Sequence, residues 1–260
     1  MVKLNSWGAL AAGILCLAAA SGSGPSACAA SAEDEQPLVT VELFTSQGCS
    51  SCLPADAYLA ELAKRPDVLA LSLPVDYWDY LGWRDTLAIP EHTKRQYDYA
   101  QKLGTRRPYT PQVVVDGHYD CVGSDKQKIE FAIKRFEKAN QTRIPVSVAQ
   151  EGTMVTVSVG ARPETRKKKP ADVTQATVWL VRFEPTHQVP IAKGENEGHT
   201  VTYTNVVRNW SPLGVWDGTP ASFKLSRTDL NREGVAFAVL VQQESTGPIL
   251  GVARFSLGTE

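Results

Sequence analysis

The chain has 260 residues, of which 43% are hydrophobic and 21% are charged, a balance typical of globular proteins. Its 27 lysines and arginines nearly match its 28 aspartates and glutamates, so the formal net charge is −1. This balance gives no reason to expect nucleic acid or an anionic membrane surface as a partner.

The first 32 residues have the layout of a cleaved export signal. Lys3 precedes an apolar stretch at 7–20, and small residues with Ala-x-Ala-like sites follow. The stretch is too short for a comfortable membrane span, and no later stretch could form one. We therefore predict a signal peptide at 1–32 and a secreted or periplasmic protein, where thiols are oxidised. A lipoprotein anchored through Cys28 is less favoured, because Pro25 stands where such signals carry an aliphatic residue.

The next segment places two cysteines between a strand and a helix. A strand-forming apolar run at 38–44 breaks at a glycine, Cys49 and Cys52 follow, and residues 54–65 have a helical pattern. Unpaired N–H groups and the helix dipole stabilise a thiolate at this position, so Cys49 should ionise more readily than free cysteine. Cys52 can close a disulfide with it or resolve a mixed disulfide. A structural disulfide and half of a metal site are the alternatives, and the adjoining strand and helix favour redox chemistry.

A second strand, at 68–73, leads into a segment rich in aromatic and acidic residues at 76–92. Aromatic side chains lose little rotamer freedom on binding, so this segment could wall a substrate groove, with Trp78 and Trp83 as substrate-binding residues. The alternative is an insertion that packs on its own aromatics and ties its carboxylates to Arg84 or to the backbone. The sequence favours neither reading.

The pattern then predicts a polar helix at 93–103, a hairpin at 112–122 and a further helix after Ser124. With Asp116-Gly117 as a two-residue turn, Gln112 pairs with Cys121. Three roles stay open for Cys121: a third thiol that serves the site, a partner for Cys28, or a buried core cysteine.

This order of elements resembles the thioredoxin fold over about residues 37–142. In that family the proline after the threonine is cis and lies against the dithiol, which implies a cis Thr110–Pro111 peptide here. The resemblance also makes Cys49 the nucleophile and Cys52 the resolving cysteine. Because proline offers no N–H, the backbone beside it is free to hold a substrate chain as an extra strand, which makes Thr110 and Pro111 substrate-binding residues.

The chain departs from thioredoxins at three positions near the dithiol. Gly48 replaces the tryptophan before the first cysteine, so no bulky side chain should cover Cys49 there. The dipeptide inside the motif is Ser50-Ser51 rather than Gly-Pro. Leu43 stands where thioredoxins carry a buried acid, and Glu42, one place off, should face the other way, which leaves the general base unidentified.

The whole chain is similar to a narrower group, the secreted bacterial proteins classed as domain of unknown function 1223. That group implies a fold and no established reaction. The shared segments are 42–52, 75–83, 109–112, 194–196 and 203–207.

Beyond residue 143 the pattern changes to strands without helices. Together they suggest an antiparallel sandwich at 144–258. The polar loop at 193–199 could reach a site, although a plain hairpin loop is the favoured reading. The predicted strands are 144–149, 153–159, 177–183, 201–207, 221–225, 236–241 and 249–255.

The predicted fold class is therefore an α/β thioredoxin-like domain at 37–143, with the aromatic insertion at 76–92, followed by an all-β antiparallel sandwich-like domain. The predicted function is an exported thiol–disulfide oxidoreductase that acts through Cys49 and Cys52 on protein thiols or disulfides. We predict no cofactor and no metal ion. The alternatives are a binding module with a structural Cys49–Cys52 disulfide and a thiolate carrier of copper or zinc. The sequence does not define redox direction or oligomeric state.

Overall fold

A computed structural model describes residues 38–105, 107–139, 143–163, 175–230 and 234–257. The predicted signal peptide lies outside these residues. Within them, no helix is both long and apolar enough to cross a bilayer. The helices are α1 (Leu53–Leu62), α2 (Pro90–Leu103), α3 (Lys126–Ala139) and α4 (Arg227–Leu230), and the 3₁₀ turns are η1 (Ser50–Cys52) and η2 (Asp79–Leu81).

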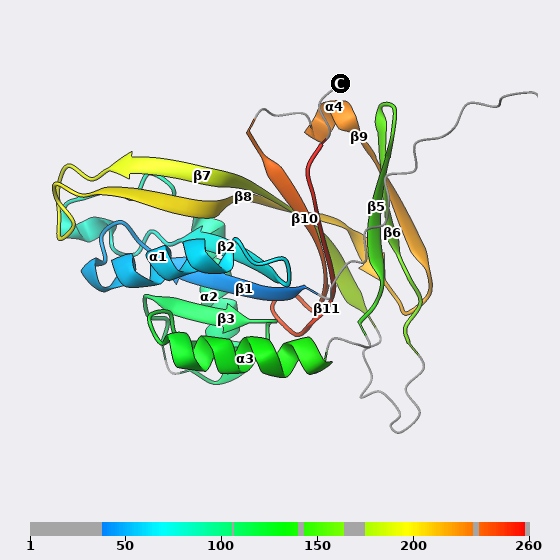
Figure 1. The fold of residues 1–260 in the computed structure, drawn as a ribbon, viewed down its shortest axis with the longest axis horizontal. Coiled ribbons are helices and arrows are strands. Elements are labelled where there is room, and N and C mark those ends of the chain that lie inside the picture. Colours follow the sequence, from blue (N-terminus) through cyan, green and yellow to red (C-terminus); the bar gives the residue numbers. More distant parts are fainter. Residues whose placement is uncertain (1–37, 106, 140–142, 164–174, 231–233, 258–260) are drawn as a thin grey trace, which may run out of the picture. The chain divides into compact units, whose positions relative to one another are not determined.

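Strands from both halves of the chain form one mixed sheet of eight strands in the order β11-β10-β7-β8-β2-β1-β3-β4 (Figure 1), and three more form a separate sheet in the order β5-β6-β9. The strands are β1 (Val39–Thr45), β2 (Val68–Pro74), β3 (Gln112–Val115), β4 (Tyr119–Val122), β5 (Val146–Glu151), β6 (Met154–Val159), β7 (Ala176–Pro190), β8 (Thr200–Trp216), β9 (Ala221–Ser226), β10 (Ala236–Gln243) and β11 (Ile249–Phe255).

This topology overturns the predicted fold class of a thioredoxin-like α/β domain followed by a separate β-sandwich. All seven strands predicted beyond residue 143 are present, but four of them extend the sheet that β1 to β4 begin. The physical reason is the length of β7 and β8, which have 15 and 17 residues and continue well past the apolar runs that mark them in the sequence. In Figure 1 they run from the small sheet past α1.

The two halves of the large sheet meet where β8 lies parallel to β2. Ser72 and Val206 form the ladder pair at this seam. Asn205 has a left-handed backbone (φ 50°), and its side-chain amide donates to the carbonyl of Ala70 at 2.8 Å. The side chain therefore supplies a hydrogen bond that a regular backbone ladder would otherwise make.

Both faces of the central strand β1 are covered, and all seven of its residues are buried. On one face Val41 and Leu43 pack with side chains of α1 and α3. On the other, Phe44 packs with Tyr99 of α2 and with residues of β2, β7 and β10. Four of its seven residues are apolar, and the buried polar ones are Thr40, Glu42 and Thr45. A separate core lies between the small sheet and β7, β10 and β11.

The β3–β4 hairpin differs from its predicted register by one residue. Val113, not Gln112, pairs with Cys121, because the turn has three residues, with Asp116 at φ 51°. Cys121 is buried in the core beneath α1 and α3, and this burial raises the pKa of its thiol to about 12. Cys121 therefore has the environment of the core cysteine among its three open roles.

Candidate functional site

The two cysteines are joined in a disulfide at the start of a helix, as the sequence predicts. Cys49 precedes η1, Cys52 ends it, and α1 follows at once. The Cys49 sulfur lies 3.3 Å from the hydroxyl of Ser51. Cys52 is fully buried, whereas Cys49 is 4% exposed. Cys49 is therefore the less buried of the two cysteines, and it lies at the positive end of the helix.

Trp78, from the aromatic segment after β2, packs against Gly48 in the cysteine loop. A Cβ on Gly48 would lie 3.2 Å from the Trp78 Cβ and 3.4 Å from the Trp78 carbonyl oxygen. The ring of Trp78 stacks on the exposed Tyr80, with centroids 6.3 Å apart. Gly48 itself places no side chain before Cys49, as expected, and a tryptophan from the segment after β2 packs against this glycine instead.

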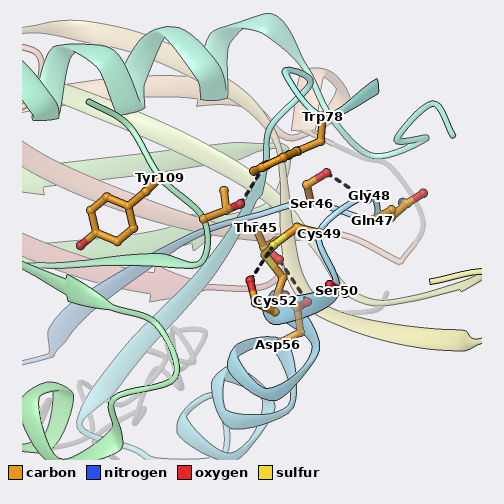
Figure 2. The surroundings of a disulfide bond; sticks show 12 residues. Thr45, Ser46, Gln47, Gly48, Cys49, Ser50, Cys52, Asp56, Trp78 and Tyr109 are labelled. Carbon is orange, nitrogen blue, oxygen red and sulfur yellow. Dashed lines mark hydrogen bonds between the residues drawn. A yellow bond between two sulfur atoms is a disulfide. The ribbon is translucent and has the colours of Figure 1, made fainter. Parts of the chain in front are cut away.

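The Thr110–Pro111 loop lies beside the disulfide together with Trp78. The peptide is cis, as the resemblance implies. The Trp78 indole N–H donates to the Thr110 hydroxyl at 2.8 Å, and Figure 2 shows this bond above the disulfide with Tyr109 to one side. Pro111 is buried, and a Cβ on Gly123 would lie 3.0 Å from its Cβ. The structure thus brings Trp78 and Thr110 together at the disulfide.

The second predicted tryptophan, Trp83, lies between two loops. Its indole N–H donates to the side-chain carbonyl of Gln47 at 2.8 Å. Its Cβ would be 3.2 Å from a Cβ on Gly194. Trp83 is therefore part of the contact between the cysteine loop and the loop that joins β7 to β8.

The β7–β8 loop reaches the cysteine loop directly. The Asn196 side-chain amide donates to the Gln47 carbonyl at 2.9 Å, and Asn196 is buried. The Glu195 carboxylate accepts hydrogen bonds from the Ser50 hydroxyl (2.9 Å) and the Ser50 backbone N–H (3.3 Å). The favoured reading of 193–199 as a plain hairpin loop missed these contacts. The polar composition of the loop was the available signal.

Two carboxyl groups are buried near the cysteine loop. Asp85 accepts hydrogen bonds from the backbone N–H of Gln47 (2.8 Å), Leu87 (2.9 Å) and Ala88 (3.1 Å), and burial raises its pKa to about 6. Asp56 accepts one from the Thr45 hydroxyl (3.0 Å), drawn in Figure 2, and burial raises its pKa to about 8. Asp56 is not among the site residues predicted from the sequence.

Glu42 lies on the opposite face of β1, as predicted. Its carboxylate pairs with Arg95 of α2 through two bonds of 2.7 and 2.9 Å, and the Tyr99 hydroxyl donates to it at 3.2 Å. Glu42 and Arg95 are both buried. The charge of Glu42 is therefore balanced by Arg95, on the face of β1 away from the disulfide.

In the described part of the chain, no three His, Cys, Asp or Glu side chains gather into a group that could hold a metal ion.

Fold and site together define a mixed-sheet protein with an intramolecular Cys-x-x-Cys disulfide at a helix N-terminus. Residues 40–242 match a protein family described as "Protein of unknown function (DUF1223)", and the chain belongs to this family.

Two solved structures are similar. Protein AGR_C_4864 from Agrobacterium tumefaciens is 33% identical, with a TM-score of 0.70 over 85% of this chain and 97% of that one. HBP35 of Porphyromonas gingivalis is 13% identical, with a TM-score of 0.56 over 85% of this chain and 76% of that one, a likeness of fold alone. A search of curated proteins finds no match.

Proposed function

We propose that the protein is an exported thiol–disulfide oxidoreductase that uses Cys49 and Cys52. The observation that carries this proposal is the position of the disulfide: Cys49 opens the first turn of a helix, where a thiolate is stabilised, and Cys52 is shielded one position before α1. In the oxidised form a substrate thiolate attacks Cys49, and Cys52 leaves. In the reverse reaction the Cys52 thiolate attacks a Cys49 mixed disulfide and releases the reduced substrate.

A purely structural role would bring little stability. The two cysteines are three positions apart and already lie in one helical turn. Loop-closure entropy for so short a loop amounts to roughly 2 kcal/mol, below the ~3 kcal/mol of a 15-residue loop. A disulfide within one helical turn does not cross-link distant elements, so it is better suited to reversible reduction and oxidation than to stabilising the fold.

The surface beside the disulfide can receive a partner chain. Trp78 and Thr110 lie next to it, and Tyr80 is 76% exposed. Tyr77, which precedes Trp78 in the chain, lines a cavity of about 540 Å³ together with Arg107 and residues of α2. Exposed aromatic side chains are the residues most often found at the centre of protein interfaces. We therefore propose a protein or peptide thiol as the substrate, bound through Trp78, Trp83, Thr110 and Pro111.

Trapping of mixed disulfides tests the proposal. Removal of the resolving thiol by Cys52→Ala should leave Cys49 joined to substrates, which non-reducing electrophoresis and mass spectrometry will detect. Cys49→Ala and Cys121→Ala are the matched controls: the first should trap nothing and the second should behave as the parent. Adducts that form equally through Cys121, or no adducts at Cys49, would refute the oxidoreductase.

One observation favours the alternative of a binding module with a structural disulfide. Cys49 is only 4% exposed, and Glu195 and Asn196 hold the adjoining loop closed. This alternative expects a disulfide that resists mild reductant, with a potential below about −300 mV. Equilibration of the protein with glutathione or dithiothreitol buffers measures that potential.

A further inference from the structure

Asp56 lies one helical turn after Cys52. In a helix, side chains four positions apart lie on the same face with their Cβ atoms about 5–6 Å apart. Cys52 has helical backbone angles (φ −81°, ψ −29°), so this geometry holds across the start of α1. Cys52 is fully buried, and Asp56 is 4% exposed. The Asp56 carboxyl is thus within reach of the Cys52 sulfur, directly or through one water molecule.

Only one of the two carboxyl oxygens of Asp56 accepts a hydrogen bond. One oxygen accepts the Thr45 hydroxyl, while the other, Oδ1, is buried and has no hydrogen-bond partner among the described residues. A buried polar atom without a partner costs free energy, so it calls for an explanation, and a redox or catalytic role is one of the recognised ones. The Cys52 thiol, formed when the disulfide opens, is a donor on the same helix face.

Between about pH 6 and pH 8, the surroundings favour a protonated Asp56 beside a charged Asp85. The groups that face Asp56 are Thr45 on β1, Asp85 before α2, Tyr203 on β8 and Cys52 on its own helix. None of these is cationic, whereas three backbone N–H groups stabilise the Asp85 carboxylate. The Asp85 charge adds to burial in raising the pKa of Asp56 to about 8. Two carboxyl groups held in different protonation states are typical of acid–base sites.

We propose that Asp56 is the proton donor and acceptor for the Cys52 sulfur during thiol–disulfide exchange. When a substrate thiolate attacks the Cys49 sulfur, the new bond forms there, the Cys49–Cys52 bond breaks, and its electron pair passes to Cys52. The Asp56 carboxylic acid gives its proton to that thiolate and becomes a carboxylate. In the reverse direction the carboxylate takes the proton from the Cys52 thiol, which then attacks the mixed disulfide.

This assignment rests on the proposed function, but its test needs only a small dithiol. Reduction of the disulfide by dithiothreitol is followed by tryptophan fluorescence, and each rate constant is divided by the fraction of dithiothreitol present as thiolate. In the wild-type protein this corrected rate constant should fall as the pH rises through about 8, because Asp56 loses its proton there. In Asp56→Asn it should be about 10²-fold lower at pH 6, the lower end of the range for general acid–base catalysis, and independent of pH.

Three further variants make the test specific. Glu130→Gln removes a carboxylate that accepts the Tyr58 hydroxyl of α1 and should leave the profile unchanged. Asp85→Asn removes the neighbouring charge and should move the fall to lower pH. Asp56→Glu keeps a carboxyl group and should keep a pH-dependent profile. If Asp56→Asn does not fold, the shift of the fall to lower pH in Asp85→Asn still tests the role of Asp56.

The outcomes separate the two proposals. A corrected rate constant that does not vary with pH in the wild-type protein, or that falls equally in Asp56→Asn, overturns the role of Asp56. A profile that depends on Asp56 together with no trapped adducts in Cys52→Ala supports proton transfer and overturns the proposed cellular reaction alone.

Discussion

Gly48 faces Trp78 so closely that a methyl group on Gly48 would lie 3.2 Å from the Trp78 Cβ. The backbone of Gly48 has no positive φ, so alanine is conformationally allowed and the clash is the main penalty. Gly48→Ala should push Trp78 away from Thr110 and destabilise the protein by about 1–3 kcal/mol, the usual cost of overpacking. Thermal unfolding and tryptophan fluorescence measure both effects.

A double variant serves as the control for this contact. Trp78→Gly removes the Cβ that lies 3.2 Å from the new methyl group, so adding Gly48→Ala to it should cost less than Gly48→Ala alone. Equal costs in the two backgrounds would contradict a direct clash with Trp78.

Glu195 places a negative charge against the first turn of the cysteine helix, where it competes with a Cys49 thiolate. After reduction, iodoacetamide should modify Cys49 before Cys121, whose thiol pKa burial raises to about 12. Glu195→Gln should speed labelling of Cys49 about two- to fivefold, as expected for loss of ~0.3–1 kcal/mol at a helix terminus. Glu197→Gln is the control on the same loop. Labelling of Cys49 no faster than that of Cys121 would contradict an activated thiol.

The stability of the protein should depend on pH through Asp56. Its folded pKa, about 8, lies above its ordinary value of 3.8, so the folded state binds the proton more tightly than the unfolded state. Its contribution is therefore fully present below pH 3.8 and lost as the pH rises through about 8. Asp56→Asn should gain stability relative to the wild type across this range. Thermal unfolding at several pH values measures the difference, and a constant difference would contradict a buried neutral acid.

The buried pair of Glu42 and Arg95 should matter for stability and not for exchange. Glu42→Gln leaves a buried guanidinium without its counter-charge, which costs about 3–5 kcal/mol. Denaturant unfolding measures this cost. The reduction profile with dithiothreitol should keep its fall near pH 8, because Asp56 is untouched. Loss of that fall in folded Glu42→Gln protein would show that the wrong carboxyl had been assigned.

The seam between β2 and β8 offers a test of the single large sheet. Asn205→Ala removes the hydrogen bond to the Ala70 carbonyl. It also puts alanine, which adopts a left-handed backbone less readily than asparagine, at φ 50°. We expect a loss of about 1–3 kcal/mol. Asn209→Ala, farther along β8 and exposed, should change stability little. Hydrogen exchange at Ser72 and Val206 locates the effect. An equal loss in both variants would contradict the seam.

Local patterns predicted much of the secondary structure and the position of the two cysteines at the start of a helix. Every predicted strand and helix from 38 to 139 is present within a few residues, because apolar period, glycine and proline act over short distances. The register of the β3–β4 hairpin was missed by one residue, since Asp116 itself enters the left-handed turn.

Contacts between distant residues were beyond such patterns. The apolar run at 201–207 does not reveal that β8 continues to Trp216, nor that its neighbour is β2. The contacts of Glu195 with Ser50 join residues 145 positions apart. Asp56 did carry a readable signal: it lies three positions before Leu59, on the face of α1 that the apolar residues define.

The pairing of β2 with β8 also fixes the order in which the chain can fold. Ser72 meets a partner, Val206, that lies 134 positions later (206 − 72). As the chain is synthesised from its N-terminus, the edge of β2 that pairs with β8 therefore stays unpaired until most of the polypeptide has been made. Strand edges of this kind join other chains readily, and closures over long sequence separations are slow. Early truncations should consequently yield aggregates rather than a smaller folded protein.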